Sequence, residues 1–195
     1  MRSAFRIAVL VLPLGLSAAC ARAVDTTDRV VDPTDRVGAI TETTSEADLL
    51  IIYGPKAVSR AAAADDKSAM TVLFAGTPDE VQIEWKNAFR SPRRITIDGG
   101  DWKTPEGIAV GAPLADLEKA NGGPFDVTGS NWDRPIRVVS WKGGKLAPRL
   151  QIDLGPADPA TPLSKALKSR RSFFESTSPT LRKANLVVKR LILEW

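Results

Sequence analysis

Two segments of the chain repeat one pattern without a gap, and this repeat restricts the fold more than any other feature. Residues 39–54 read AITETTSEADLLIIYG, and residues 107–122 read GIAVGAPLADLEKANG. Each has an apolar, strand-like start, contains Ala-Asp-Leu and ends in glycine, which predicts a strand, a turn and a short helix. The similarity continues in VQIEWKN (81–87) and RVVSWKG (137–143). We therefore predict two related helix-plus-strands units, at residues 39–100 and 107–155.

The residues around the two helices carry start and stop signals. Thr43 and Glu46 have the spacing of a capping box at the first helix, and Pro113 suits the first position of the second helix. Gly54 and Gly122 suit left-handed C-caps.

The rest of the chain is rich in predicted strands. Alternating apolar and polar residues at 95–97 and 150–154 are typical of antiparallel strands with one side in water. A surface loop or an extra short helix is expected at 60–68, and a third helix between Pro162 and Phe174. Strands are predicted at Met70–Phe74, Val81–Trp85, Arg94–Ile97, Ile108–Val110, Ile136–Trp141, Leu150–Leu154 and Leu186–Trp195. The expected fold class is α+β, with two related helix-plus-antiparallel-strands units sharing one sheet, plus a C-terminal helix and strand, in one domain spanning 38–195.

The first 23 residues have the layout of a signal peptide. Arg2 and Arg6 precede the apolar run Ile7–Leu16, and small residues follow at 17–19. The run is about half as long as the roughly 20 apolar residues of a membrane-spanning helix. We therefore expect an exported, periplasmic protein.

The end of this leader contains a candidate lipidation site at Cys20. The sequence LSAAC (16–20) resembles the lipobox of bacterial lipoproteins, in which the cysteine becomes the lipid-bearing first residue. The usual pattern has leucine three places before the cysteine, where this chain has Ser17. Cleavage after Ala21 or Ala23 is the alternative, since both sites have the small-x-small form. The sequence leaves both cuts open.

Residues 24–37 read VDTTDRVVDPTDRV, a seven-residue duplication. The stretch is polar, contains a proline and lacks a helical stripe, so it predicts a flexible tether between the leader and the domain.

Composition removes several classes of function. The 195 residues contain no histidine and one cysteine, which excludes Ser-His and Cys-His nucleophile pairs, most zinc sites and internal disulfides. We expect no cofactor and no metal. Removing Arg2 and Arg6 lowers the formal charge from +4 to +2, so nucleic acid is not an expected partner.

Carboxylates are the remaining candidates for catalysis. Asp98, Asp101 and Glu106 crowd one glycine-rich turn, and Asp126 and Asp133 flank another. Such groups can hydrolyse sugars or hold a hard cation, but aspartate beside glycine is also typical of turns. The sequence therefore favours a non-catalytic role and assigns no catalytic residue, with a carboxylate-based, sugar-directed hydrolase as the alternative.

Tryptophans divide into two predicted groups. Trp85 and Trp141 end alternating strands and are expected in the core. Trp102 and Trp132, each followed by a charged residue in a loop, are candidates for stacking on a ligand at the surface.

The C-terminal part is rich in positive charge. Between Pro159 and Leu193 the sequence has one acidic residue, Glu175. The basic residues in this range are Lys165, Lys168, Arg170, Arg171, Arg182, Lys183, Lys189 and Arg190. We name Lys168, Arg170 and Arg171 as candidate binding residues for an anionic envelope polymer, phospholipid headgroups or an acidic protein. A solvated helix face explains the same charges equally well.

The second unit carries a resemblance to known folds. The stretch from Gly107–Gly111 through Asp116-Leu117 to Gly122 resembles the tandem units of the β-lactamase-inhibitor-protein fold and the single unit of small outer-membrane-assembly lipoproteins. NGGPF (121–125) and NWD (131–133) resemble an uncharacterised family of exported bacterial proteins. The resemblance implies helices against one concave antiparallel sheet that works through protein contacts, and it brings no catalytic residue. We expect an envelope protein that binds or scaffolds a protein or an envelope polymer, and an enzyme-inhibitor role is a further alternative.

Overall fold

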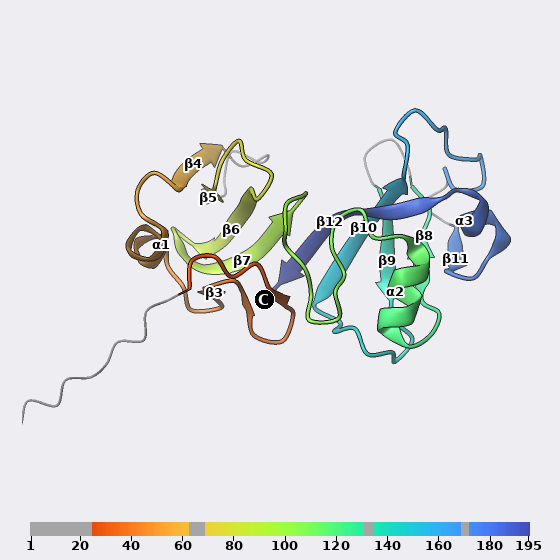
Figure 1. Ribbon diagram of the computed structural model, residues 1–195, viewed down its shortest axis with the longest axis horizontal. Helices are drawn as coiled ribbons and strands as arrows, with labels where there is room; N and C mark the ends of the chain where they lie inside the picture. Colours follow the sequence, from red (N-terminus) through yellow and green to blue (C-terminus); the bar gives the residue numbers. More distant parts are fainter. Residues whose placement is uncertain (1–24, 63–68, 131–134, 169–171) are drawn as a thin grey trace, which may run out of the picture.

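The computed structural model describes residues 25–62, 69–130, 135–168 and 172–195 (Figure 1). The predicted signal peptide, Cys20, Trp132, Arg170 and Arg171 lie outside these ranges. Within them the chain forms a nine-stranded sheet, a small three-stranded sheet and three short helices. None of these helices is long and apolar enough to cross a membrane.

The large sheet is antiparallel throughout its described pairings, in the order β11-β8-β9-β10-β12-β7-β6-β5-β4. The last strand lies in the middle, and Figure 1 shows it crossing between the two halves of the molecule. This confirms the predicted α+β class, dominated by antiparallel strands. The strands are β4 (Val58–Ala62), β5 (Ala69–Leu73), β6 (Val81–Asn87), β7 (Arg90–Ile97), β8 (Asp126–Thr128), β9 (Ile136–Ser140), β10 (Leu150–Pro156), β11 (Phe173–Glu175) and β12 (Leu186–Glu194).

One predicted strand is absent, and one strand enters a segment where a loop or helix was expected. Residues 108–110 form no strand, and Ala109 makes an isolated bridge with Lys103. The loop or helix expected at 60–68 begins instead as the end of β4, which pairs with β5.

The two predicted helices are α1 (Glu46–Tyr53) and α2 (Leu114–Asn121). The capping box of α1 uses Ser45 and Asp48 rather than Thr43 and Glu46: the Ser45 amide donates to Asp48 Oδ2 (2.8 Å), and the Asp48 amide donates to Ser45 Oγ (3.2 Å). The predicted pair is wrong because the Glu46 side chain turns inward.

Of the three other predicted helix ends, the left-handed C-cap of α2 is confirmed and the other two differ. Pro113 is the N-cap of α2 rather than its first helical residue. Gly122 is a left-handed C-cap with φ 77°, whereas Gly54 has φ 80° with an extended ψ of 161°.

The third predicted helix, at 162–174, is wrong. Phe173 and Phe174 belong to β11, which pairs with β8, and the backbone at 164–168 forms turns around buried Leu167. Aromatic residues pack well on a pleated surface, and pairing with β8 outweighs the weak helical pattern. The third helix is instead α3 (Pro179–Lys183), with Ser178 as N-cap and proline at its first turn.

The tether predicted at 24–37 is wrong from residue 25 onward. These residues run into a three-stranded sheet of β1 (Val31–Asp32), β2 (Arg36–Val37) and β3 (Ile40–Thr41). Val31 and Val37 are buried, and the Val31 amide donates to the Lys103 carbonyl at 2.8 Å. The segment is polar on average, but these two valines supply enough apolar contact to hold it on the domain.

The seven-residue duplication has a structural role in this segment. In each copy an aspartate accepts a hydrogen bond from the backbone amide two residues later: Thr27 to Asp25 and Thr34 to Asp32, both 2.9 Å. These Asx turns bend the chain back on itself. The hydrogen bonds from the two threonines lower the pKa of both aspartates.

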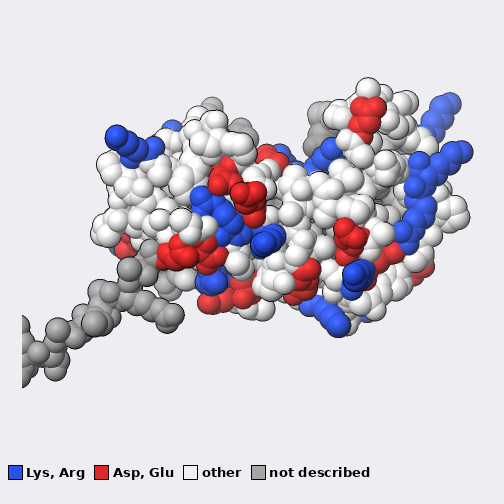
Figure 2. Space-filling view, viewed as in Figure 1, with Lys and Arg blue, Asp and Glu red and all other residues white. Residues whose placement is uncertain are grey.

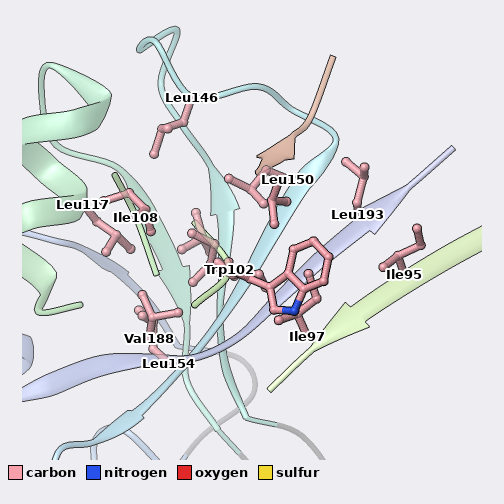
Figure 3. Close-up of a cluster of buried hydrophobic side chains, with 14 of the residues drawn as sticks. Ile95, Ile97, Trp102, Ile108, Leu117, Leu146, Leu150, Leu154, Val188 and Leu193 are labelled. Atoms are coloured by element: carbon pink, nitrogen blue, oxygen red, sulfur yellow. The ribbon is translucent and has the colours of Figure 1, made fainter. Parts of the chain in front are cut away.

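Trp102 lies at the centre of the core, which corrects its prediction as a surface residue. Its side chain is 0% exposed, and Figure 3 shows the indole among aliphatic side chains that include Ile97 and Leu193. The indole N–H donates to the Asp79 carbonyl (3.0 Å), and the Arg29 guanidinium lies 5.0 Å from the ring. The N-terminal segment therefore covers the tryptophan that a loop position seemed to expose.

Gly38 shows how tightly this segment packs. It has φ +54°, and a Cβ there would meet Trp102 at 3.2 Å and the Asp28 carbonyl oxygen at 3.0 Å. The close approach of the backbone to the indole therefore requires glycine.

A polar network joins α1 to the sheet through buried Glu46. Its carboxylate accepts hydrogen bonds from Thr71 Oγ1 (2.7 Å) and from the Arg60 guanidinium (2.5 and 3.0 Å). Thr71 Oγ1 in turn accepts from the indole of Trp85 (3.0 Å), which is buried as predicted. Burial alone would raise the pKa of Glu46, but the hydrogen bonds from Arg60 and Thr71 outweigh it and lower the pKa.

This network predicts a pH-dependent contribution to stability. Because the folded-state pKa of Glu46 lies below its ordinary value of 4.5, the charged carboxylate stabilises the fold above that value, and the contribution is lost as pH falls through the folded-state pKa. We expect Glu46→Gln to unfold more easily than the wild type in urea at pH 7. The difference should shrink steadily on acidification, and a difference that grew toward low pH would contradict the assignment.

Candidate binding surface

The large sheet has one apolar and one polar face. In β6, for example, Val81, Ile83 and Trp85 are buried in the core, while Gln82 and Glu84 between them are partly exposed. The same alternation in β7 and β10 places polar side chains on the side away from the core. We call this side the open face.

One row of cross-strand contacts on the open face joins β6, β7, β12 and β10. Glu84 lies opposite Arg94, which lies opposite Glu194. Arg94 donates to Glu194 Oε1 (2.7 Å) and reaches Glu84 Oε1 (3.4 Å), and Gln151 donates to Glu194 Oε2 (2.7 Å). Burial would lower the pKa of Arg94, but the two carboxylates raise it, so the charge is retained.

A second row runs parallel to the first. Arg190 donates to Asp98 Oδ1 (2.5 Å) and lies 3.8 Å from Asp153, and Arg137 donates to Asp153 through two nitrogens (2.6 and 3.0 Å). The hydrogen bond with Asp98 raises the pKa of Arg190. The contacts of Arg94 with Glu84 and Glu194, and those of Asp153 with Arg137 and Arg190, join residues that lie directly opposite one another, where antiparallel strands interact most strongly.

The structure places the carboxylates that the hydrolase alternative names in different surroundings, and Asp133 lies outside the described residues. Asp98 is engaged by Arg190, while Asp101 and Glu106 are exposed and do not line the hollow that Asp98 shares with Glu80. Where the pKa of a described carboxyl group is displaced it is lowered, as for Asp79, which accepts a hydrogen bond from the Asp101 amide. Within the described ranges, no three Asp, Glu or Cys side chains are grouped to hold a metal ion.

A hollow opens where the second row ends. β9 and β10 pair at two positions, Ile136 with Leu154 and Arg137 with Asp153, and then separate. Between them lies a space of about 590 Å³, lined by both strands and by the loop that joins them. Its volume is in the range of ligand pockets. We call this space the β9–β10 hollow.

The loop beside this hollow is held in place by α2. Asn121, the last residue of the helix and buried, donates through Nδ2 to the Trp141 carbonyl (3.0 Å) and accepts from the Lys145 amide (2.8 Å). Trp141 is buried as predicted, and its indole donates to the Leu150 carbonyl on β10 (3.2 Å). Gly144 passes so close to Asn121 that a Cβ would collide with its side chain, at 2.1 Å. The shape of the hollow therefore depends on this fixed loop.

Exposed apolar side chains flank the hollow. Val139, on β9, is 49% exposed and lines both this hollow and a neighbouring one of about 460 Å³, which Phe173 also lines. Phe173 is 69% exposed. A bulge between β8 and β9 leaves Val139 without a partner on β8, since Val138 pairs with Val127 and Ser140 with Asp126. Bulges redirect side chains and end pairing.

The basic C-terminal residues do not form one free patch. Arg182 is paired with Glu118 and Arg190 with Asp98, while Lys168 is exposed in a turn. Figure 2 shows Lys and Arg side chains along the edge of the molecule where α3 lies, so part of the expected basic surface is present there.

The sequence contained a signal for the missed apolar residues. In the stretch Ile136-Arg-Val-Val139, side chains alternate between the two faces of the sheet. Ile136 and Val138 are buried, so Val139 lies on the polar face. Similarly, of two adjacent phenylalanines in a strand, one faces away from the core.

No protein-family model matches the chain, and no curated protein matches it in sequence. Among solved structures, the fold is similar to that of the uncharacterized protein YfeY from Escherichia coli, with a TM-score of 0.54. The two sequences are 16% identical, and the match covers 85% of this chain and 99% of the other. At this identity the similarity supports a shared fold and carries no function.

Proposed function

We propose that this protein is an exported envelope protein that binds an extended segment of a protein partner in the β9–β10 hollow, without catalysis. The observation that carries the proposal is the early separation of β9 from β10, which leaves two strand edges facing one space. An extended peptide can add to such edges through backbone hydrogen bonds, while neighbouring pockets select its side chains.

The surroundings favour an apolar segment over an anionic polymer. The cations beside the hollow already have partners: Arg137 pairs with Asp153, and Lys142 with Glu175 (2.5 Å) and Asp126 (3.3 Å). Val139 and Phe173 provide apolar surface instead. Burial of exposed apolar side chains is the main favourable contribution to most protein association.

The location in the envelope and the anchor rest on the leader sequence. We propose that the leader directs export, and that Cys20 becomes the lipid-bearing first residue of the mature chain. This anchor would hold the protein at a membrane facing the periplasm, where the partner is then another envelope protein.

We also propose that the two helix-plus-strands units are tandem copies of one module. Each helix is followed by an antiparallel meander, β4-β5-β6-β7 after α1 and β8-β9-β10 after α2, and β12 separates the two. Trp85 and Trp141, which correspond in the repeat, are both buried. These observations support a distant relation to the tandem units of the β-lactamase-inhibitor-protein fold, whose members work through protein contacts.

Site-specific crosslinking tests the binding site. A photoreactive amino acid at position 139 should give a discrete protein adduct in cells. The same photoreactive amino acid at position 106 should not, because Glu106 is exposed and lines neither of the two hollows. The adducted segment of the partner can be identified by mass spectrometry and synthesised as a peptide.

The purified components then measure the contribution of the hollow. We expect the peptide to bind the wild type and to lose about tenfold or more in affinity with Val139→Asp, since a charge replaces apolar contact. Glu106→Gln is the matched control and should bind normally. A peptide that bound all three proteins equally would exclude the hollow as the site.

A further inference from the structure

Helix α1 exposes apolar side chains on its outer surface. Its sequence, EADLLIIY, has apolar residues almost all round, yet in this helix the buried side chains are Glu46 and Leu49. Ile51 is 83% exposed and Leu50 is 41% exposed. A helix lying on a protein surface ordinarily presents polar residues to water, so the exposed face of α1 is suited to an apolar environment.

A proline and a lysine extend this exposed surface beyond the end of the helix. Pro55 and Lys56 directly follow the helix and its C-cap, and both are exposed. A lysine beside apolar side chains can place its charge among lipid phosphates while its stem stays in apolar surroundings. We call Leu50, Ile51, Pro55 and Lys56 the α1 tip.

The N-terminal segment places the α1 tip near the point where an anchor would attach. The Ala39 amide donates to the Tyr53 hydroxyl (3.2 Å), which joins the segment to α1. The described chain begins at the same end of the molecule as α1 (Figure 1). Cys20 precedes Asp25 by five residues, which span at most about 18 Å when extended.

We infer that the α1 tip contacts the lipid surface, with Leu50 and Ile51 entering the headgroup region and Lys56 meeting lipid phosphates. The inference rests on the proposed lipid anchor at Cys20. Because residues from 25 onward are packed on the domain rather than forming a long tether, an anchored chain holds this end at the bilayer. Additional apolar contacts at the α1 tip would fix the orientation of the anchored domain at the bilayer.

Depth-dependent fluorescence quenching tests this orientation. In the lipidated mature protein the thiol of Cys20 is consumed by the anchor, so Ile51→Cys carries a single free thiol for an environment-sensitive fluorophore. The labelled protein is reconstituted into phosphatidylethanolamine and phosphatidylglycerol vesicles that contain nitroxide lipids. The control is Val139→Cys, an exposed apolar position on the other half of the sheet.

We expect quenching at residue 51 to be several-fold stronger than at residue 139, and weaker when Leu50→Glu and Lys56→Glu are added. Equal quenching at both positions would overturn the inference, as would a blue-shifted but unquenched probe at residue 51, which indicates a protein contact. Fractionation of cells with Cys20→Ala separates the two proposals. If membrane association is unchanged by that substitution, the anchor and this inference both fail, whereas an anchored protein with an unquenched residue 51 contradicts the inference alone.

Discussion

Replacing Trp102 with alanine should lower the free energy of unfolding by about 4 kcal/mol, the size of loss found for large aromatic residues in well-packed cores. The side chain is 0% exposed, so the substitution removes the whole indole from the core and leaves a cavity. It also removes the donor to the Asp79 carbonyl and the ring beside the Arg29 guanidinium. Because small domains are stable by about 5–15 kcal/mol, urea unfolding should show a large shift of the midpoint.

The same substitution should release the N-terminal segment before the rest of the domain unfolds. Arg29 and Arg36 lie in this segment and are sites for trypsin once the segment detaches. We expect faster cleavage there in Trp102→Ala, at protease concentrations that leave the wild type intact. Trp102→Phe, which keeps most of the buried volume, should lose less stability. A loss below about 1 kcal/mol for the alanine variant would contradict a core position.

Local patterns predicted the elements well because their causes are local. Alternation over 150–154 and the Ala-Asp-Leu helices act within a few residues, and the strands and helices are where those patterns indicate. The central position of β12 depends on pairing with β7 and β10, which are far away in sequence. Periodicity within a strand does not specify which strand it pairs with.

The two largest errors have one cause. The sequence predicted that the N-terminal segment was too polar to fold and that Trp102 was exposed in its loop. In the structure the two cover each other. Val31 donates a hydrogen bond to Lys103, which follows Trp102, and Gly38 packs on the indole. Neither half of a long-range contact has a distinctive pattern on its own.

The charged candidates failed for a related reason. Asp98 looked like a catalytic acid and Arg190 like part of a basic patch, but Asp98 directly follows β7 and pairs with Arg190 on the neighbouring strand β12. Composition counts charges and cannot show which ones neutralise each other. The hollow was also hidden, because it arises where pairing between β9 and β10 ends.

Replacing Arg137 with methionine should cost about 2 kcal/mol of stability, the second-largest effect that we expect. Its partner Asp153 has a side chain that is 2% exposed, and removing one member of a buried ion pair leaves the other charge without compensation. The loss stays below that of a fully buried pair because Arg137 is 37% exposed and Arg190 remains 3.8 Å from Asp153. Methionine keeps most of the apolar stem of arginine, so the loss reports on the charge.

A double-mutant cycle separates this charge effect from packing. Arg137→Met combined with Asp153→Asn should recover part of the stability lost in Arg137→Met, because no unpaired carboxylate then remains buried. Strictly additive losses in urea unfolding would show that the pair does not interact. The pair is also the last contact between β9 and β10 before they separate, so it fixes the mouth of the β9–β10 hollow. We therefore expect Arg137→Met to weaken binding of the partner peptide at temperatures where the variant is still folded, and the double variant to bind more nearly like the wild type.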